Sequence, residues 1–147
     1  MKIKECMSLN PIYVSGEDTV YTVAKLMNEN HIGVIPVCDD TKKVVGIITD
    51  RDIILRSIAW DKDVKQTPAV EVMSPDVITA TADMSVSEVA KKMQENQVRR
   101  IPVMENNQIV GMISVGDLAN EDKVGGREVA DTMECICGCH GQVKNAE

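Results

Sequence analysis

The sequence has 147 residues, of which 44% are hydrophobic and 27% are charged, the balance typical of a soluble globular protein. A formal net charge of −7 argues against a broad phosphate-binding surface and so against general nucleic-acid binding. No apolar run approaches membrane-spanning length, and the first residues lack the apolar segment of an export signal. Five cysteines, an odd number, fit a reducing compartment. We therefore expect a cytoplasmic protein with no nucleic-acid or membrane partner.

An internal repeat spans most of the chain. Its clearest matches are Met7-Ser8 with Met73-Ser74, Ile35-Pro36-Val37 with Ile101-Pro102-Val103, and Val45-Gly46 with Val110-Gly111. We divide the chain into repeat 1 (residues 1–60), a polar linker (61–69), repeat 2 (70–120) and a C-terminal tail (121–147).

Each repeat predicts the same order of elements, β-α-β-β-α. Short extended segments are expected at 11–14 and 77–81, and each is followed by a helix with apolar residues at i, i+3, i+4 and i+7. Those apolar residues are Val20, Val23, Ala24 and Met27, and then Val86, Val89, Ala90 and Met93. The later strands are expected at 34–38 and 44–49 and at 100–104 and 109–114, and the closing helices at 51–59 and 116–120.

One repeat alone would bury too little surface to be stable. We therefore predict an α+β fold in which two β-α-β-β-α repeats pack sheet to sheet about a pseudo-two-fold axis. With phenylalanine absent and only 2% aromatic residues, the core must be built from aliphatic side chains and methionine. In the first part of the tail, residues 123–133, we expect a helical turn or two despite Gly125-Gly126.

The candidate binding residues lie where the last strand of each repeat meets its closing helix. Thr49 is followed three residues later by Asp52, and Ser114 by Asp117. A carboxylate can accept hydrogen bonds from both vicinal hydroxyls of a ribose, and a hydroxyl and backbone N–H groups at a helix start favour a phosphate. The plain structural alternative is that both aspartates only cap their helices.

Cationic side chains are needed if a phosphate is to bind near these carboxylates. Arg51, Arg56, Arg99 and Arg100 are available. In repeat 2, Val115-Gly116 replaces Asp50-Arg51, so the two sites are not equivalent.

Each of the two β-α-β-β-α units has Met-Ser near its start, Ile-Pro-Val in its middle and Gly-h-h-Thr/Ser-x-x-Asp near its end, where h is an apolar residue and x any residue. This duplicated pattern resembles a CBS-domain pair, or Bateman module. The resemblance covers residues 3–120. It implies a regulatory module and not an enzyme, with no required cofactor. The regulatory ligand would be AMP, ADP, ATP or a compound like S-adenosylmethionine, bound in clefts between the repeats. It also implies a homodimer, while the downstream partner protein is not specified.

Transferring the family pattern groups the site residues into two sets, each drawn from both repeats. The first set is Thr49, Arg51 and Asp52 with Ile78, Val98, Arg99 and Arg100. The second set is Ser114 and Asp117 with Ile12, Ile32, Gly33 and Val34. The apolar members would sandwich an adenine. Arg99 and Arg100 would meet phosphates, and because the equivalent residues Gly33 and Val34 carry no charge, we expect the first set to form the stronger site.

The tail contains Cys135, Cys137, Cys139 and His140 within six residues. Thiolates and imidazole suit Zn²⁺ or Cu⁺, although the close spacing makes a site shared between two chains easier to build than one within a chain. The same thiols could instead be redox-active, or a reduced segment without either role. We assign no metal site. The alternative to the sensor is thus a metal- or thiol-responsive protein that uses the repeats as a dimerising scaffold.

Overall fold

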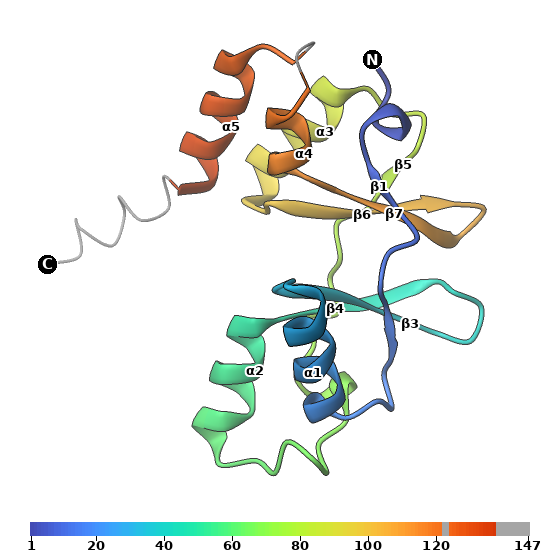
Figure 1. Cartoon of the computed structure of the whole chain (residues 1–147), viewed down its shortest axis with the longest axis vertical. Coiled ribbons are helices and arrows are strands. Elements are labelled where there is room, and N and C mark those ends of the chain that lie inside the picture. The colour runs from blue at the N-terminus through green and yellow to red at the C-terminus, as the bar shows by residue number, and fades with distance from the viewer. Residues whose placement is uncertain (122–123, 138–147) are drawn as a thin grey trace, which may run out of the picture. The chain divides into compact units, whose positions relative to one another are not determined.

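The computed structural model describes residues 1–121 and 124–137, which fold into two compact units (Figure 1). Unit 1 contains Met1–Pro11, Ile78–Asn106 and the described residues from Val110 onward. Unit 2 contains Ile12–Val77 and Asn107–Ile109. Each unit therefore combines the body of one repeat with the opening residues of the other.

Unit 2 is built from a three-stranded sheet and two α-helices. The sheet order is β2-β3-β4, with β2 parallel to β3 and β3 antiparallel to β4. The strands predicted at 34–38 and 44–49 are confirmed, whereas the predicted closing helix is shorter and is followed by a separate 3-10 turn. The elements are β2 (Val14–Ser15), α1 (Val20–Asn30), β3 (Val34–Cys38), β4 (Val44–Thr49), α2 (Asp50–Arg56), η2 (Ile58–Trp60) and η3 (Ala69–Glu71).

Unit 1 repeats this arrangement and adds a strand and a helix. Its sheet order is β1-β7-β6-β5, and the helix α5 packs on α3 and α4 (Figure 1). The capping box expected at Ser85 begins α3, with Ser85 N donating to Glu88 Oε2 at 2.8 Å. The elements are η1 (Ile3–Glu5), β1 (Ser8–Leu9), β5 (Ala80–Thr81), α3 (Val86–Asn96), β6 (Arg100–Glu105), β7 (Gln108–Ser114), α4 (Val115–Ala119) and α5 (Gly126–Cys137).

The Met-Ser segment that opens each repeat pairs with the last strand of the other repeat. In unit 1, Ser8 pairs antiparallel with Met112 of β7. In unit 2, Ser74 pairs with Ile47 of β4 through two backbone hydrogen bonds of 2.9 and 2.8 Å. The two compact units therefore do not coincide with the two sequence repeats, because each repeat lends its opening residues to the other.

The glycine in each last strand leaves room for this Met-Ser segment. A Cβ at Gly111 would lie 2.8 Å from the carbonyl oxygen of Ser8 and 3.0 Å from Met7 Sδ. At Gly46 a Cβ would likewise collide with the Met73 side chain. The glycine of the Gly-h-h-Thr/Ser motif thus places a residue without a side chain where the Met-Ser segment of the other repeat crosses the strand. We call this Met-Ser segment the exchanged segment.

Each unit has its own aliphatic core, as the composition predicts. In unit 1 the fully buried side chains include Met93, Ile101 and Leu118, and in unit 2 they include Ile35 and Ile48. The alternating burial of β7 reflects a sheet with one face turned to its core.

The tail is more helical than the turn or two expected, because α5 runs from Gly126 to Cys137. Its apolar residues recur at helical spacing, and Val129, Met133 and Ile136 pack against the core of unit 1. The buried Thr132 accepts a hydrogen bond of 2.8 Å from Gln94 of α3. Tertiary packing on α3 and α4 outweighs the low helix propensity of Gly126, which stands at the first position only.

We predict that Gly111→Ala destabilises the protein by about 1–3 kcal/mol, because the new methyl group would press on the Ser8 backbone, which cannot rotate away. Urea denaturation followed by circular dichroism measures the change. Gly125→Ala is the matched control, since no heavy atom lies within 4 Å of a Cβ built at that position. Equal stability of Gly111→Ala and Gly125→Ala would contradict the proposed role of the glycine.

Candidate ligand-binding site

Thr49 and Asp52 cap α2 through two reciprocal hydrogen bonds. Asp52 N donates to Thr49 Oγ1 at 3.0 Å, and Thr49 N donates to Asp52 Oδ2 at 3.0 Å. The side chain of Asp52 is 15% exposed, and its second oxygen, Oδ1, lies 3.8 Å from Arg56 Nε. Capping therefore uses one carboxylate oxygen, whereas the other lies outside the cap and faces the Arg56 guanidinium.

Ser114 and Asp117 form the matching turn at the start of α4, with one difference. Asp117 N donates to Ser114 Oγ at 3.1 Å and Ser114 N donates to Asp117 Oδ2 at 2.8 Å, as in repeat 1. In addition, the Ser114 hydroxyl donates to Asp117 Oδ2 at 2.7 Å. No such hydroxyl–carboxylate bond is found for Thr49 among the described residues. The Ser114 proton is thus committed within the turn, whereas the Thr49 hydroxyl can still donate to a ligand.

The segment before β3 carries an acidic neighbour. Asp50 N donates to the carbonyl oxygen of Gly33 at 3.0 Å, and a Cβ at Gly33 would lie 2.9 Å from Asp50 Oδ2. The Asp50 carboxylate therefore rests against Gly33, a member of the second predicted set. An anion placed at Gly33 would be repelled by this carboxylate.

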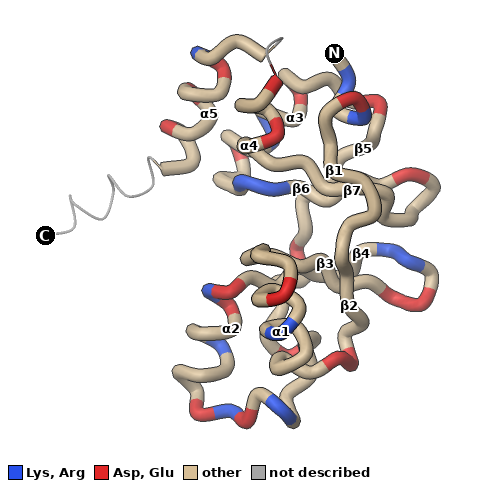
Figure 2. The backbone as a smooth tube through the Cα atoms, in the orientation of Figure 1, with Lys and Arg blue, Asp and Glu red and all other residues tan. Residues whose placement is uncertain are grey.

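The matching segment before β6 has the opposite charge. Val115 N donates to the carbonyl oxygen of Arg99 at 3.0 Å, so Arg99 and Val115 occupy the positions of Gly33 and Asp50. Arg99 and Arg100 are both exposed, and Figure 2 shows them as the basic run at the start of β6. Arg99 Nη2 also lies 3.9 Å from the Cys137 sulfur of α5.

The apolar members of the two sets line the edges of the two cores. Ile78 and Val98 are half-buried and pack against the core of unit 1. Ile12 and Ile32 do the same in unit 2, and Val34 is half-buried at the start of β3. Each of these side chains is partly exposed and can contact a flat ring.

The structure divides each predicted set between the two units. Of the first set, Thr49, Arg51 and Asp52 belong to unit 2 and the remaining members to unit 1. Of the second set, Ser114 and Asp117 belong to unit 1 and the remaining members to unit 2. Within its own unit, each part of a set lies either where the last strand meets the closing helix or in the segments that lead into the earlier strands. Their grouping across the units stays a prediction.

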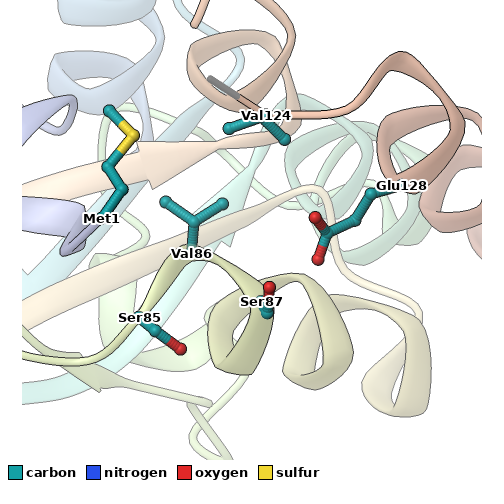
Figure 3. A pocket seen from close by; sticks show the side chains of 6 residues that line it. All are labelled: Met1, Ser85, Val86, Ser87, Val124 and Glu128. Carbon is teal, nitrogen blue, oxygen red and sulfur yellow. The ribbon is translucent and has the colours of Figure 1, made fainter.

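A pocket of about 130 Å³ lies at the start of α3 in unit 1 and contains none of the predicted site residues. Figure 3 shows the apolar side chains of Met1, Val86 and Val124 with the oxygen atoms of Ser87 and Glu128 around it. Ligand sites for drug-sized molecules usually have volumes of roughly 300–1,000 Å³, so this pocket is too small for a nucleotide.

The cysteines differ in environment. Burial and the neighbouring Asp39 raise the pKa of the Cys38 thiol to about 11, so this thiol is protonated at neutral pH. Cys135 and Cys137 are exposed on α5. Side chains at i and i+2 of a helix point away from each other, so these two thiols do not form a chelating pair within α5. Cys139 and His140 lie outside the described residues.

The described residues contain no group of three or more His, Cys, Asp or Glu side chains that could hold a metal ion. In the same part of the chain, no helix combines the length and hydropathy needed to cross a membrane.

Comparison with known proteins adds a family match. The family model for the CBS domain matches residues 3–58 and 69–123. CBS domain-containing protein YhcV of Bacillus subtilis is 37% identical over 117 residues, covering 80% of this chain and 82% of that protein. Hypoxic response protein 1 of Mycobacterium tuberculosis is 31% identical over 116 residues, covering 79% of this chain and 81% of that protein.

Two crystal structures are similar in fold. That of Hypoxic Response Protein I with two coordinated zinc ions has a TM-score of 0.77 and 30% identity, covering 82% of this chain and 98% of that chain. That of the CBS domain pair of protein MJ0100 contains 5'-methylthioadenosine and S-adenosyl-L-methionine. Its TM-score is 0.72 at 29% identity, covering 81% of this chain and 93% of that chain.

Proposed function

Because this chain belongs to the CBS-domain family, we propose that it is a non-catalytic sensor module that binds an adenosine-containing ligand. The observation that carries the proposal is the duplicated hydroxyl–carboxylate turn, in which capping uses Oδ2 of Asp52 and leaves Oδ1, 3.8 Å from Arg56 Nε, outside the cap. The adenosyl compounds in the MJ0100 CBS pair support the ligand class.

Different members of the first set would bind the ribose, the phosphate and the adenine of the ligand. Asp52 Oδ1 would accept hydrogen bonds from the ribose hydroxyls, and the Thr49 hydroxyl would donate to a phosphate oxygen. The exposed guanidinium groups of Arg99 and Arg100 would bind the phosphate, because their planar fork matches two phosphate oxygens. Ile78 and Val98 would contact the adenine.

The second set would bind more weakly, for two reasons present within the separate units. The Ser114 hydroxyl already donates to Asp117, and so offers no proton to a phosphate. The Asp50 carboxylate beside Gly33 opposes an anion where the first set has Arg99. We therefore propose one strong site per chain for ligands that carry a phosphate.

Sensing requires that the ligand bind one arrangement of the chain better than another. A ligand held by residues of both units would favour arrangements in which those residues converge. The ligand would thereby change the surface that the protein offers to a partner.

A thermal-shift panel of AMP, ADP, ATP, NADH and S-adenosylmethionine tests the proposal. A ligand present at roughly 100 times its Kd stabilises the folded state by about 2.7 kcal/mol and should raise Tm by about 5 °C or more. If none of the five compounds raises Tm, the nucleotide-sensor proposal is wrong.

We predict that Asp52→Asn weakens binding of the best ligand by roughly 10- to 100-fold, because one charged acceptor is lost. Asparagine keeps an oxygen that can accept from Thr49 N, so the helix cap is preserved. The control is Asp117→Asn, the same change at the equivalent position, which should leave the strong site intact. Calorimetric titration measures both, and equal loss in the two variants would contradict the assignment, as would unchanged affinity of Asp52→Asn.

Arg99 should distinguish ligands by their phosphate. We predict that Arg99→Gln weakens AMP binding by about tenfold or more and leaves adenosine binding nearly unchanged, because a charged hydrogen bond to phosphate is lost. Arg127→Gln is the control, since the side chain of Arg127 is 94% exposed and pairs with Asp131 on the same helix, α5. An equal loss for AMP and adenosine would show that Arg99 acts on the fold and not on the phosphate.

A second candidate function uses the cysteine-rich tail, and two observations favour it. Cys135 and Cys137 are exposed, and the similar structure of Hypoxic Response Protein I contains two coordinated zinc ions. Because the two thiols point apart on α5, a bound metal would need ligands from beyond the helix or from a second chain. We predict that native mass spectrometry shows a mass loss on chelation if the tail holds metal. An unchanged mass would remove this candidate.

A further inference from the structure

The guanidinium of Arg56, in the last turn of α2, bridges the Asp52 carboxylate and the exchanged segment of repeat 2. Its Nη1 donates to the carbonyl oxygens of Val72 and Met73 at 3.4 and 3.2 Å and to the Ser74 hydroxyl at 3.3 Å. Its Nε lies 3.8 Å from Asp52 Oδ1, the carboxylate oxygen outside the helix cap. Five N–H donors in a rigid plane allow one guanidinium to serve both sides at once.

These contacts give Arg56 a role different from binding phosphate, for which the sequence alone offers it. Its Nη1 is directed at oxygen atoms of the chain, and its Nε faces a carboxylate. The Asp52 carboxylate in turn is held by the Thr49 amide at Oδ2 and by Arg56 at Oδ1. A carboxylate held at both oxygens keeps one orientation, and Oδ1 still has a lone pair for a ribose hydroxyl.

The segment that Arg56 holds leads directly toward another member of the first set. Ser74 is fixed to β4 by two backbone hydrogen bonds with Ile47, of 2.8 and 2.9 Å. Four residues later comes Ile78, which we assign to the adenine and which is the first residue of unit 1 after the boundary at Val77. Arg56 therefore joins the residue proposed for the ribose to the stretch of chain that carries the residue proposed for the adenine.

Repeat 2 has the opposite charge at this position. Four residues after Asp117 it carries Glu121, where repeat 1 has Arg56 four residues after Asp52. An ionised carboxylate only accepts hydrogen bonds, so Glu121 cannot donate to the carbonyl oxygens of an exchanged segment. Burial, and after it the neighbouring carboxylates of Glu121 and Asp117, raise the pKa of the thiol of Cys6, the residue before the exchanged segment of repeat 1. The bridge is therefore a feature of repeat 1, whose turn we assign to the stronger site.

We propose that Arg56 is the positioning residue of the first set, which holds Asp52 in the orientation that accepts a ribose and ties it to the exchanged segment. This role rests on the proposed function and extends it from where the ligand binds to how the chain responds. Binding free energies are reciprocal, so a ligand whose binding depends on this bridge also stabilises the pairing of Ser74 with β4.

A double-mutant cycle with Asp52 tests whether Arg56 acts through the carboxylate. In calorimetric titrations of the full chain with AMP, we expect Arg56→Gln to bind about tenfold more weakly than wild type, because the ligand must then order a mobile carboxylate. In the Asp52→Asn background the same change should weaken binding by less than about twofold, since residues that act as a pair are not additive. Lys25→Gln, which removes an exposed charge from the same unit, should bind like wild type. An equal loss in both backgrounds would overturn the proposal.

Adenosine separates this role from direct phosphate binding. Because Arg56 acts on the residue that accepts the ribose, Arg56→Gln should weaken adenosine and AMP by the same factor, unlike Arg99→Gln. A loss confined to AMP would make Arg56 a phosphate ligand and overturn the positioning role. AMP that fails to bind wild type would overturn the proposed function and the role of Arg56 with it, whereas normal AMP binding by Arg56→Gln would overturn the role of Arg56 alone.

Amide hydrogen exchange measured by NMR tests the contact with the exchanged segment in the protein without ligand. The Ser74 amide, which donates to Ile47, should exchange at least about threefold faster in Arg56→Gln, because the bridge no longer holds the segment against β4. The Val20 amide, which donates to Thr67 in the same unit, is the reference for global stability and should be unchanged. In wild type, saturating AMP should slow the Ser74 amide more than the Val20 amide. Equal effects at both amides would overturn the link to the exchanged segment.

Discussion

The backbone pairing between a Met-Ser segment and the last strand of the other repeat is the interaction on which both units depend. Ser74 bonds to Ile47, two residues before Thr49, and Ser8 pairs with Met112, two residues before Ser114. The exchanged segments thus hold the strand ends from which the candidate ligand groups project. Gly46 and Gly111 make this possible, since any side chain there would collide with the crossing segment. Fold and candidate site therefore share one constraint.

The same backbone carries different chemistry in its two copies. The amide of the residue that begins α2 or α4 donates to the residue before the central strand, joining Asp50 to Gly33 in one unit and Val115 to Arg99 in the other. The hydrogen bond is the same in both units, whereas the side chains differ, because Asp50 is matched by Val115 and Gly33 by Arg99. The outer helices differ too, because Ile54, Leu55, Ile58 and Trp60 are exposed on α2 and η2, whereas α5 packs on α3 and α4.

Much of this could be predicted because periodic patterns report local structure. The strands Val34–Cys38 and Val44–Thr49 follow from their flanking turns, and Ser85 with Glu88 marks the start of α3. The segment exchange could not be predicted, because backbone pairing of Ser8 with Met112 leaves no trace in side-chain pattern. The helix α5 exceeds the turn or two expected, because packing on α3 outweighs the low helix propensity of Gly126. The difference between Thr49 and Ser114 is one hydrogen bond from the Ser114 hydroxyl to Asp117, which spacing alone does not reveal.

The central claim is that the two copies of the turn are unequal and that the one at Thr49 and Asp52 binds a phosphate-bearing adenosine ligand. Calorimetric titration of the full chain with AMP tests it most directly, because the stoichiometry counts the sites. We expect one tight site per chain, and any second site should bind at least tenfold more weakly because a charged hydrogen bond is lost. Two sites of equal affinity, or a single site that survives Asp52→Asn and is lost in Asp117→Asn, would contradict it.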